Sequence, residues 1–184
     1  YFQHCESANP FYEAIPDIVQ DYMDRISAIT GRSYHLFDYY GASDADRVIV
    51  AIGSVTDICK EVSDALNENG EKVGVLNVHL YRPFSVKHFI DQLPESVKKI
   101  AVLDRTREPG AIGEPLFLDV QSAVTSSGRN IRVCGGRYGL GSKDVTPEDI
   151  MAVYEHLKAE TPRHNFTLSI KDDVTSLSLT PVPV

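Results

Sequence analysis

Short apolar runs alternate with amphipathic stretches from about residue 47 to residue 157. The runs are rich in Val and Ile, and continuous apolar runs of this length are typical of strands buried on both faces of a parallel sheet. The predicted strands are 47–53, 72–78, 99–103 and 131–134.

The stretches between these runs carry apolar residues three and four positions apart, which predicts helices. Their expected starts are Ser54, Ser85, Glu114 and Thr146. Ser54 with Asp57 has the spacing of a capping box, and Thr146 is followed by Pro147 and by an acid at the third position. Strands alternating with helices imply right-handed crossovers. We therefore predict an α/β fold, a three-layer α/β/α arrangement with a mostly parallel sheet.

The two ends of the chain have a different pattern. Helical spacing over Pro10–Thr30 predicts a helix that stops at Gly31, and a tyrosine-rich connector follows at 34–46. Its aromatic residues, Tyr34, Phe37, Tyr39 and Tyr40, are expected to anchor on a surface that belongs partly to a missing neighbour. Phe166–Ile170 could add a strand or begin an arm. The predicted division is 1–46, the end of a preceding domain; 47–160, the α/β domain; and 161–184, a C-terminal strand or arm and linker.

Composition and charge limit the function classes. The chain of 184 residues is 42% hydrophobic and 24% charged, which is ordinary for one globular domain with an arm. Its net charge of −8 disfavours a nucleic-acid partner, and no basic run or long apolar stretch points to a membrane. The N-terminus has no apolar signal core and no initiator Met, so we expect the chain to start inside a longer polypeptide.

The three cysteines, Cys5, Cys59 and Cys134, contain no CxxC pair. We therefore expect no zinc or iron–sulfur site within the chain. Cys59 and Cys134 are expected to be buried thiols, and an odd cysteine count suits a reducing cytoplasm.

Ligands of open parallel sheets bind beyond the carboxyl ends of the strands. The loops expected there are 53–54, 79–83, 104–113 and 135–143. The last, GGRYGLGSKD, holds weak candidates for an anion site, namely Arg137, Ser142 and Lys143. A phosphate-binding GxxxxGK[ST] order is absent, and the alternative is an irregular loop whose glycines pack closely against another domain.

The remaining polar side chains near these loops point to no defined reaction. The charged run 104–108 suggests mutual salt bridges or an interdomain contact, and Arg82 near His79 could clamp a carboxylate or phosphate. No nucleophile and base share a recognisable spacing, and the other histidines are scattered. We predict no catalytic and no metal-binding residue.

The segment 48–120, with a strand ending in Gly-Ser, a strand leading into RPF and a strand ending in an acid, resembles the transketolase C-terminal-like domain of thiamine-diphosphate enzymes. The blocks 1–42 and 135–150, with the ending NFTLSIKDDVTSLSL, more specifically resemble pyruvate:ferredoxin (flavodoxin) oxidoreductase. The likeness covers essentially the whole chain and would make residues 1 to about 30 the tail of a pyrimidine-binding domain.

This resemblance implies a parent enzyme that converts pyruvate and CoA to acetyl-CoA and CO2 and passes electrons to ferredoxin or flavodoxin. It implies thiamine diphosphate, Mg²⁺, iron–sulfur clusters and CoA for the parent and none of them for this piece. The piece would be an inactive packing module, with other domains of the polypeptide and a second subunit as partners. The expected interface residues are Arg82, Asp104, Arg105, Gly113, Gly135, Gly136, Tyr138 and Gly139.

Two other hypotheses stay open at this point. Arg137 and Lys143 motivate an anion- or CoA-phosphate-binding module, and binding of CoA that is absent or equal in wild type and an alanine double variant would reject it. A stand-alone α/β enzyme of unknown reaction is disfavoured by the missing start Met and the missing nucleophile–base set.

Overall fold

A computed structural model describes residues 1–184 and contains a six-stranded sheet in the order β1-β3-β2-β4-β5-β6. β1 runs antiparallel to β3, and all other neighbours are parallel. The strands are β1 Phe37–Gly41, β2 Arg47–Ala51, β3 Val73–Val78, β4 Lys99–Asp104, β5 Arg132–Arg137 and β6 Phe166–Thr167.

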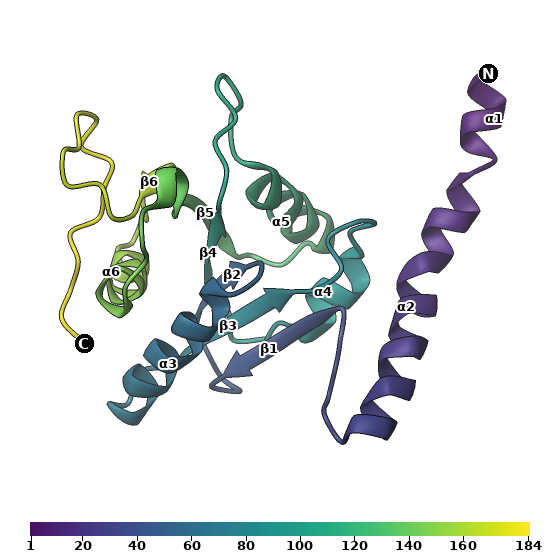
Figure 1. Cartoon of the computed structure of the whole chain (residues 1–184), viewed down its shortest axis with the longest axis horizontal. Helices are drawn as coiled ribbons and strands as arrows, with labels where there is room; N and C mark the ends of the chain where they lie inside the picture. Colours follow the sequence, from purple (N-terminus) through teal and green to yellow (C-terminus); the bar gives the residue numbers. More distant parts are fainter.

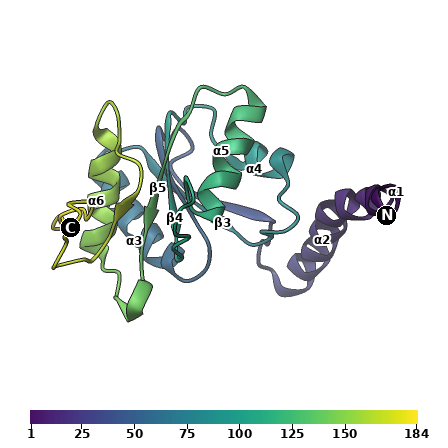
Figure 2. The same cartoon turned by 90° about the horizontal axis from the view of Figure 1, so that it is seen from above.

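Helices cover both faces of this sheet, which confirms the predicted three-layer arrangement. α3 (Val55–Glu68) and α6 (Pro147–Lys158) lie on one face, and α4 (Val86–Gln92) and α5 (Pro115–Ser127) lie on the other (Figure 2). A single-turn 3₁₀ helix, η1, spans Leu140–Ser142. No helix has the length and apolar character needed to cross a membrane.

Two cores lie on opposite faces of the sheet because successive strand side chains point to opposite faces. In β2, Val48 and Val50 join the core under α4 and α5, whereas Ile49 and Ala51 join the core under α3 and α6. All four are fully buried, so a continuous apolar run is what this central strand requires.

The N-terminal helices α1 (Phe2–Glu6) and α2 (Asn9–Thr30) project from this body (Figures 1 and 2). α2 ends as predicted, at Gly31 in the left-handed conformation. It touches the body through Val19 and Met23, and the Gln20 amide accepts the N–H of Leu36 at 3.1 Å. Pro16 is buried and Ile15 is half-buried. Most other large apolar side chains stay in solvent, namely Phe11, Tyr12, Ile18, Tyr22, Ile26 and Ile29, with Tyr1 and Phe2 before them.

The structure corrects part of the predicted connector at 34–46. Phe37–Gly41 is the edge strand β1, and Phe37 is 1% exposed in this chain's own core. Tyr39 is half-buried and its hydroxyl donates to the Ala42 carbonyl at 2.5 Å. The exposed aromatic side chains therefore gather mainly on α1 and α2 rather than in the connector.

Two further details differ from the expectation. Ser54 stands at the N-cap of α3 but makes no side-chain capping bond, whereas Ser85 and Thr146 cap α4 and α6 as predicted. β5 also continues through Gly135 and Gly136 to Arg137, residues that the sequence assigned to a loop. The strand needs glycine at 136, because a Cβ there would lie 2.1 Å from the Phe166 ring.

The C-terminal segment after residue 160 adds strand β6, as the apolar run 166–170 suggested. Beyond it the chain turns back, and the Thr167 N–H donates to the Leu177 carbonyl at 3.0 Å, while the Leu179 N–H donates to the Thr167 carbonyl at 2.9 Å. The arm thereby covers the edge of β6 that would otherwise be open.

Candidate functional site

The carboxyl ends of β2 and β4 form the topological switch point of the sheet, because the chain leaves β2 toward β3 on one side and returns to β4 on the other. A hollow of about 580 Å³ lies at this point. Its walls include 52–54 after β2, 103–106 at the end of β4, Tyr81, Leu116 and Tyr138. The predicted strand-end loops therefore do converge.

Asp104, which ends β4, is committed to the fold. Its two carboxylate oxygens each accept one backbone N–H, from Leu116 and Phe117, at 3.0 Å. These N–H groups belong to the first turn of α5, where donors have no partner within the helix. Burial raises the pKa of Asp104, although the two N–H bonds act to lower it. The carboxylate thus fixes α5 to the end of β4.

Glu114, at the N-cap of α5, holds the neighbouring loop together. It is 4% exposed, forms an ion pair with Arg137 and accepts the Glu108 N–H at 2.7 Å. Arg107 lies 3.5 Å away. Burial by itself would raise the pKa of Glu114, but the bonds from Arg137 and Glu108 outweigh it, and the pKa is lowered. No ion pair joins two residues of the run 104–108, so the predicted mutual salt bridges are wrong; Arg107 pairs with Glu114 instead. The alternative of an interdomain contact stays a prediction.

Sequence reasoning missed Glu114 as an organising residue. The available signal was its position directly before Pro115, since proline at the first helical position marks the preceding residue as the N-cap. The choice of Arg137 as its partner, 23 positions away, depends on the pairing of β4 with β5 and has no local signal.

The three weak candidates for an anion site lie near one another, but they differ in whether their side chains are already bonded within the chain. Arg137 is held by Glu114 and by the Asn165 amide oxygen at 2.9 Å, and its side chain is 11% exposed. Ser142 and Lys143 are exposed, and Lys143 makes no ion pair. Arg137 and Lys143 both line a second hollow of about 320 Å³.

The proposed interface residues fall into two groups. Arg82 and Arg105 are exposed; Arg82 pairs with Asp119 at 2.7 Å and stacks on Tyr81, and Arg105 donates to the Gly139 carbonyl at 3.2 Å. The others are buried within this chain, namely Asp104, Gly113, Gly135, Gly136, Tyr138 and Gly139. Their part in an interface stays a prediction.

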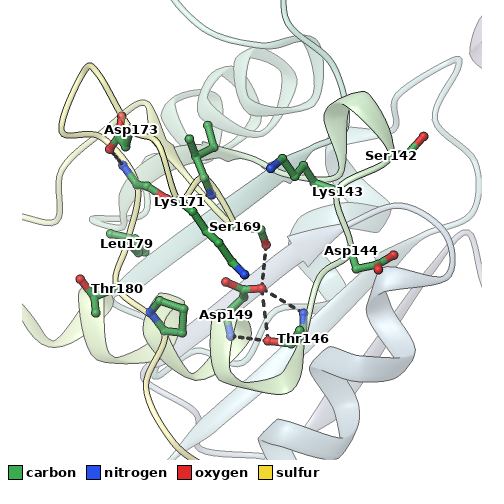
Figure 3. Close-up of a pocket in the computed structure, with 13 residues that line it drawn as sticks. Ser142, Lys143, Asp144, Thr146, Asp149, Ser169, Lys171, Asp173, Leu179 and Thr180 are labelled. Atoms are coloured by element: carbon green, nitrogen blue, oxygen red, sulfur yellow. Dashed lines mark hydrogen bonds between the residues drawn. The ribbon is translucent and has the colours of Figure 1, made fainter.

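A third hollow, of about 670 Å³, lies between the start of α6 and the C-terminal arm (Figure 3). Asp149 at its floor is 2% exposed; one carboxylate oxygen accepts from the Thr146 N–H at 3.0 Å and the Ser169 hydroxyl at 2.7 Å. The other oxygen has no hydrogen-bond partner, and Lys171 points toward this carboxylate in Figure 3. Both lysines and aspartates line this hollow, so its charge is mixed. Asp149 forms the capping box of α6 together with Thr146.

The three cysteines are free thiols, and two of them are buried. Cys59 and Cys134 are buried as predicted, and burial raises the pKa of each thiol to about 12. Cys5 is exposed on the projecting helix α1.

Comparison with known proteins gives consistent matches. The family model described as pyruvate:ferredoxin oxidoreductase core domain II matches residues 45–150. The chain is 57% identical to a pyruvate-flavodoxin oxidoreductase from Enterobacter agglomerans and 55% identical to a pyruvate:ferredoxin oxidoreductase from Moorella thermoacetica. Each alignment covers 97% of this chain and 15% of the relative.

A solved structure with a distant likeness is the 2-oxoglutarate:ferredoxin oxidoreductase from Magnetococcus marinus with 2-oxoglutarate, coenzyme A and succinyl-CoA bound. It shares 18% sequence identity with a TM-score of 0.47, over 72% of this chain and 21% of that one.

Proposed function

The chain belongs to the pyruvate:ferredoxin oxidoreductase family, in which it matches core domain II, and from this membership we propose that it is a non-catalytic packing module of a much larger enzyme. The main support for the proposal is the small share of each relative that this chain covers. The chain aligns over nearly its whole length yet spans about 15% of the curated relatives that it matches.

The projecting helix α2 supports this role. Its side chains Phe11 and Ile29 are 75% and 84% exposed, and a row of such residues on one helix is the kind of surface that further protein covers. We propose that residues 1 to about 30 complete a preceding domain and that 161–184 are an arm and linker, with the arm adding β6 to the sheet. The predicted boundary at residue 46 is wrong, because β1 (Phe37–Gly41) is an edge strand of the module's own sheet. The partners are then other domains of the polypeptide and a second subunit.

For the whole enzyme we propose the reaction of the relatives, in which pyruvate and CoA give acetyl-CoA and CO2 with electrons passed to ferredoxin or flavodoxin. Thiamine diphosphate, Mg²⁺, iron–sulfur clusters and CoA would be held outside this chain. We place the enzyme in the cytoplasm, where buried thiols stay reduced.

The first experiment measures activity and cofactor binding of the 184-residue chain. We expect neither CO2 release from labelled pyruvate nor calorimetric binding of thiamine diphosphate with Mg²⁺. Decarboxylation by the purified chain would overturn the proposal.

The second experiment tests the packing role of α2. Ile29→Lys should leave the melting temperature of the isolated chain unchanged, because this side chain is 84% exposed. In a full-length oxidoreductase carrying this segment, it should destabilise the assembly and lower activity, since a charge would be buried. Glu13→Lys, also on α2 and exposed, is the matched control and should be tolerated in both forms. Equal tolerance of Ile29→Lys in both forms would contradict the packing role of this surface.

A further inference from the structure

We propose that the hollow enclosed by the 137–143 segment, β6 and the C-terminal arm binds a phosphate group, either free or as the ester of a small organic molecule. Its volume of about 320 Å³ lies at the lower end of the range for small-molecule sites. The proposal concerns binding by this chain itself and does not depend on its role as a packing module.

The charges that line this hollow are all of one sign. Arg107, Arg137 and Lys143 line it, and no aspartate or glutamate does. Among the neighbouring acids, Glu114 is paired with Arg137, and Asp173 accepts the Thr175 and Ser178 N–H groups at 3.0 Å and 2.6 Å. Asp144 follows Lys143 in the chain but does not line this hollow. Because Glu114 offsets the charge of Arg137, the positive excess comes from Arg107 and Lys143, on a chain with a net charge of −8. Screening over about 8 Å at physiological salt lets these near cations outweigh distant carboxylates.

Thr167 supplies an independent sign of a missing polar partner. It is 9% exposed, lines the hollow, and its hydroxyl oxygen is closed off from solvent without a hydrogen-bond partner. Thr167 pairs with Arg137 across β5 and β6, so their side chains lie on the same face of the sheet. A buried unpaired hydroxyl is unfavourable by about 1–3 kcal/mol. Rotation of the Thr167 side chain toward the hollow would let a phosphate oxygen satisfy it.

The donors suit a tetrahedral oxyanion. Lys143 provides an unpaired ammonium, and one terminal nitrogen of Arg137 stays free, because Glu114 takes Nε and Asn165 takes Nη2. Both partners hold the guanidinium in place before a ligand arrives, which reduces the ordering cost of binding. Most of the remaining wall is apolar and comes from Leu140, Leu168, Ile170 and Leu177. This wall would accept a small apolar group on a phosphate ester.

Lys143→Gln and Thr167→Val are the test variants, because they remove one donor each without touching the Glu114–Arg137 pair. The matched control is Lys98→Gln, an exposed lysine beside the amino end of β4 with the same charge change. Binding of inorganic phosphate and of phenyl phosphate is measured by NMR titration of the labelled chain at constant ionic strength. Melting temperatures check that every variant is folded.

We expect saturable binding in wild type, weakened about tenfold by Lys143→Gln and about fivefold by Thr167→Val, which correspond to one charged and one neutral hydrogen bond. Lys98→Gln should bind like wild type. Tighter binding of phenyl phosphate would identify an ester ligand, and equal binding would identify phosphate itself. No saturable binding of either probe, or equal losses in Lys143→Gln and Lys98→Gln, would overturn the proposal.

Discussion

Glu114→Gln is the perturbation that most directly tests how the strand-end loops are held. The carboxylate is 5% exposed at its side chain and compensates Arg137, which is itself 11% exposed. Glutamine keeps the shape and one acceptor for the Glu108 N–H but removes the charge. The Arg137 guanidinium would then be buried with only the Asn165 amide as a partner.

Removal of one partner from a buried ion pair costs about 3–5 kcal/mol. Because Arg137 keeps its bond to Asn165, we expect a loss of unfolding free energy at the lower end of this range, about 3 kcal/mol. For a chain of this size, each kcal/mol shifts the melting temperature by about 2–4 °C, so the expected fall is about 6–12 °C.

Urea unfolding at pH 7 measures this loss, with Asp21→Asn as the control. Asp21 and Arg25 also form an ion pair, at 2.6 Å, but their side chains are 56% and 64% exposed. Such surface pairs contribute about 0–1 kcal/mol, so the control should lose little. Equal losses in the two variants would refute the reasoning, because burial is the feature that separates the pairs.

The pH dependence gives a second check on Glu114. Its pKa is lowered in the folded chain, so its stabilisation is fully present above the unfolded value of about 4.3 and is lost as pH falls through the folded pKa. The gap between wild type and Glu114→Gln should therefore be constant near neutral pH and close in acid. A gap that widens on acidification would mean that the pKa is raised instead.

Three further predictions concern the same framework, each measured by urea unfolding. Asp104→Asn should cost about 1–3 kcal/mol, because an amide has one acceptor oxygen for two buried N–H groups, whereas the exposed Asp144→Asn should cost little. Gly136→Ala should cost about 1–3 kcal/mol, because the new Cβ would lie 2.1 Å from the Phe166 ring; a neutral result would show that the ring can move freely. Thr146→Ala should cost about 1 kcal/mol through loss of the α6 cap, and no change would mean that the capping box is not formed in solution.

Local sequence patterns were sufficient to predict most of the helices and strands. Apolar runs and helical spacing located β2 to β5 and α3 to α6, because strand and helix periodicities are expressed within a few residues. The Thr146 cap and the Gly31 stop were also predictable, since each depends on its immediate neighbours. The family could be identified from sequence blocks alone.

Errors occurred where a residue's partner lies far along the chain. Phe37 was expected to anchor on a neighbouring surface, but pairing of β1 with β3 turns it into this chain's own core. Gly135 and Gly136 have turn chemistry, yet they continue β5, because they pair with Val102 and Leu103 of β4. They are glycines because the Phe117 and Phe166 rings occupy the space that side chains would need.

The sequence by itself therefore determined the order of strands and helices from β2 to α6 and the family to which the chain belongs. Only the tertiary structure decided which charged side chains are paired within the chain and which stay free to bind a ligand. It places Glu114 beside Arg137, brings Thr167 next to that arginine and leaves Lys143 unpaired. The physical reason is that helix and strand preferences act between neighbours, whereas the partner of a buried charge is chosen by sheet register over tens of residues.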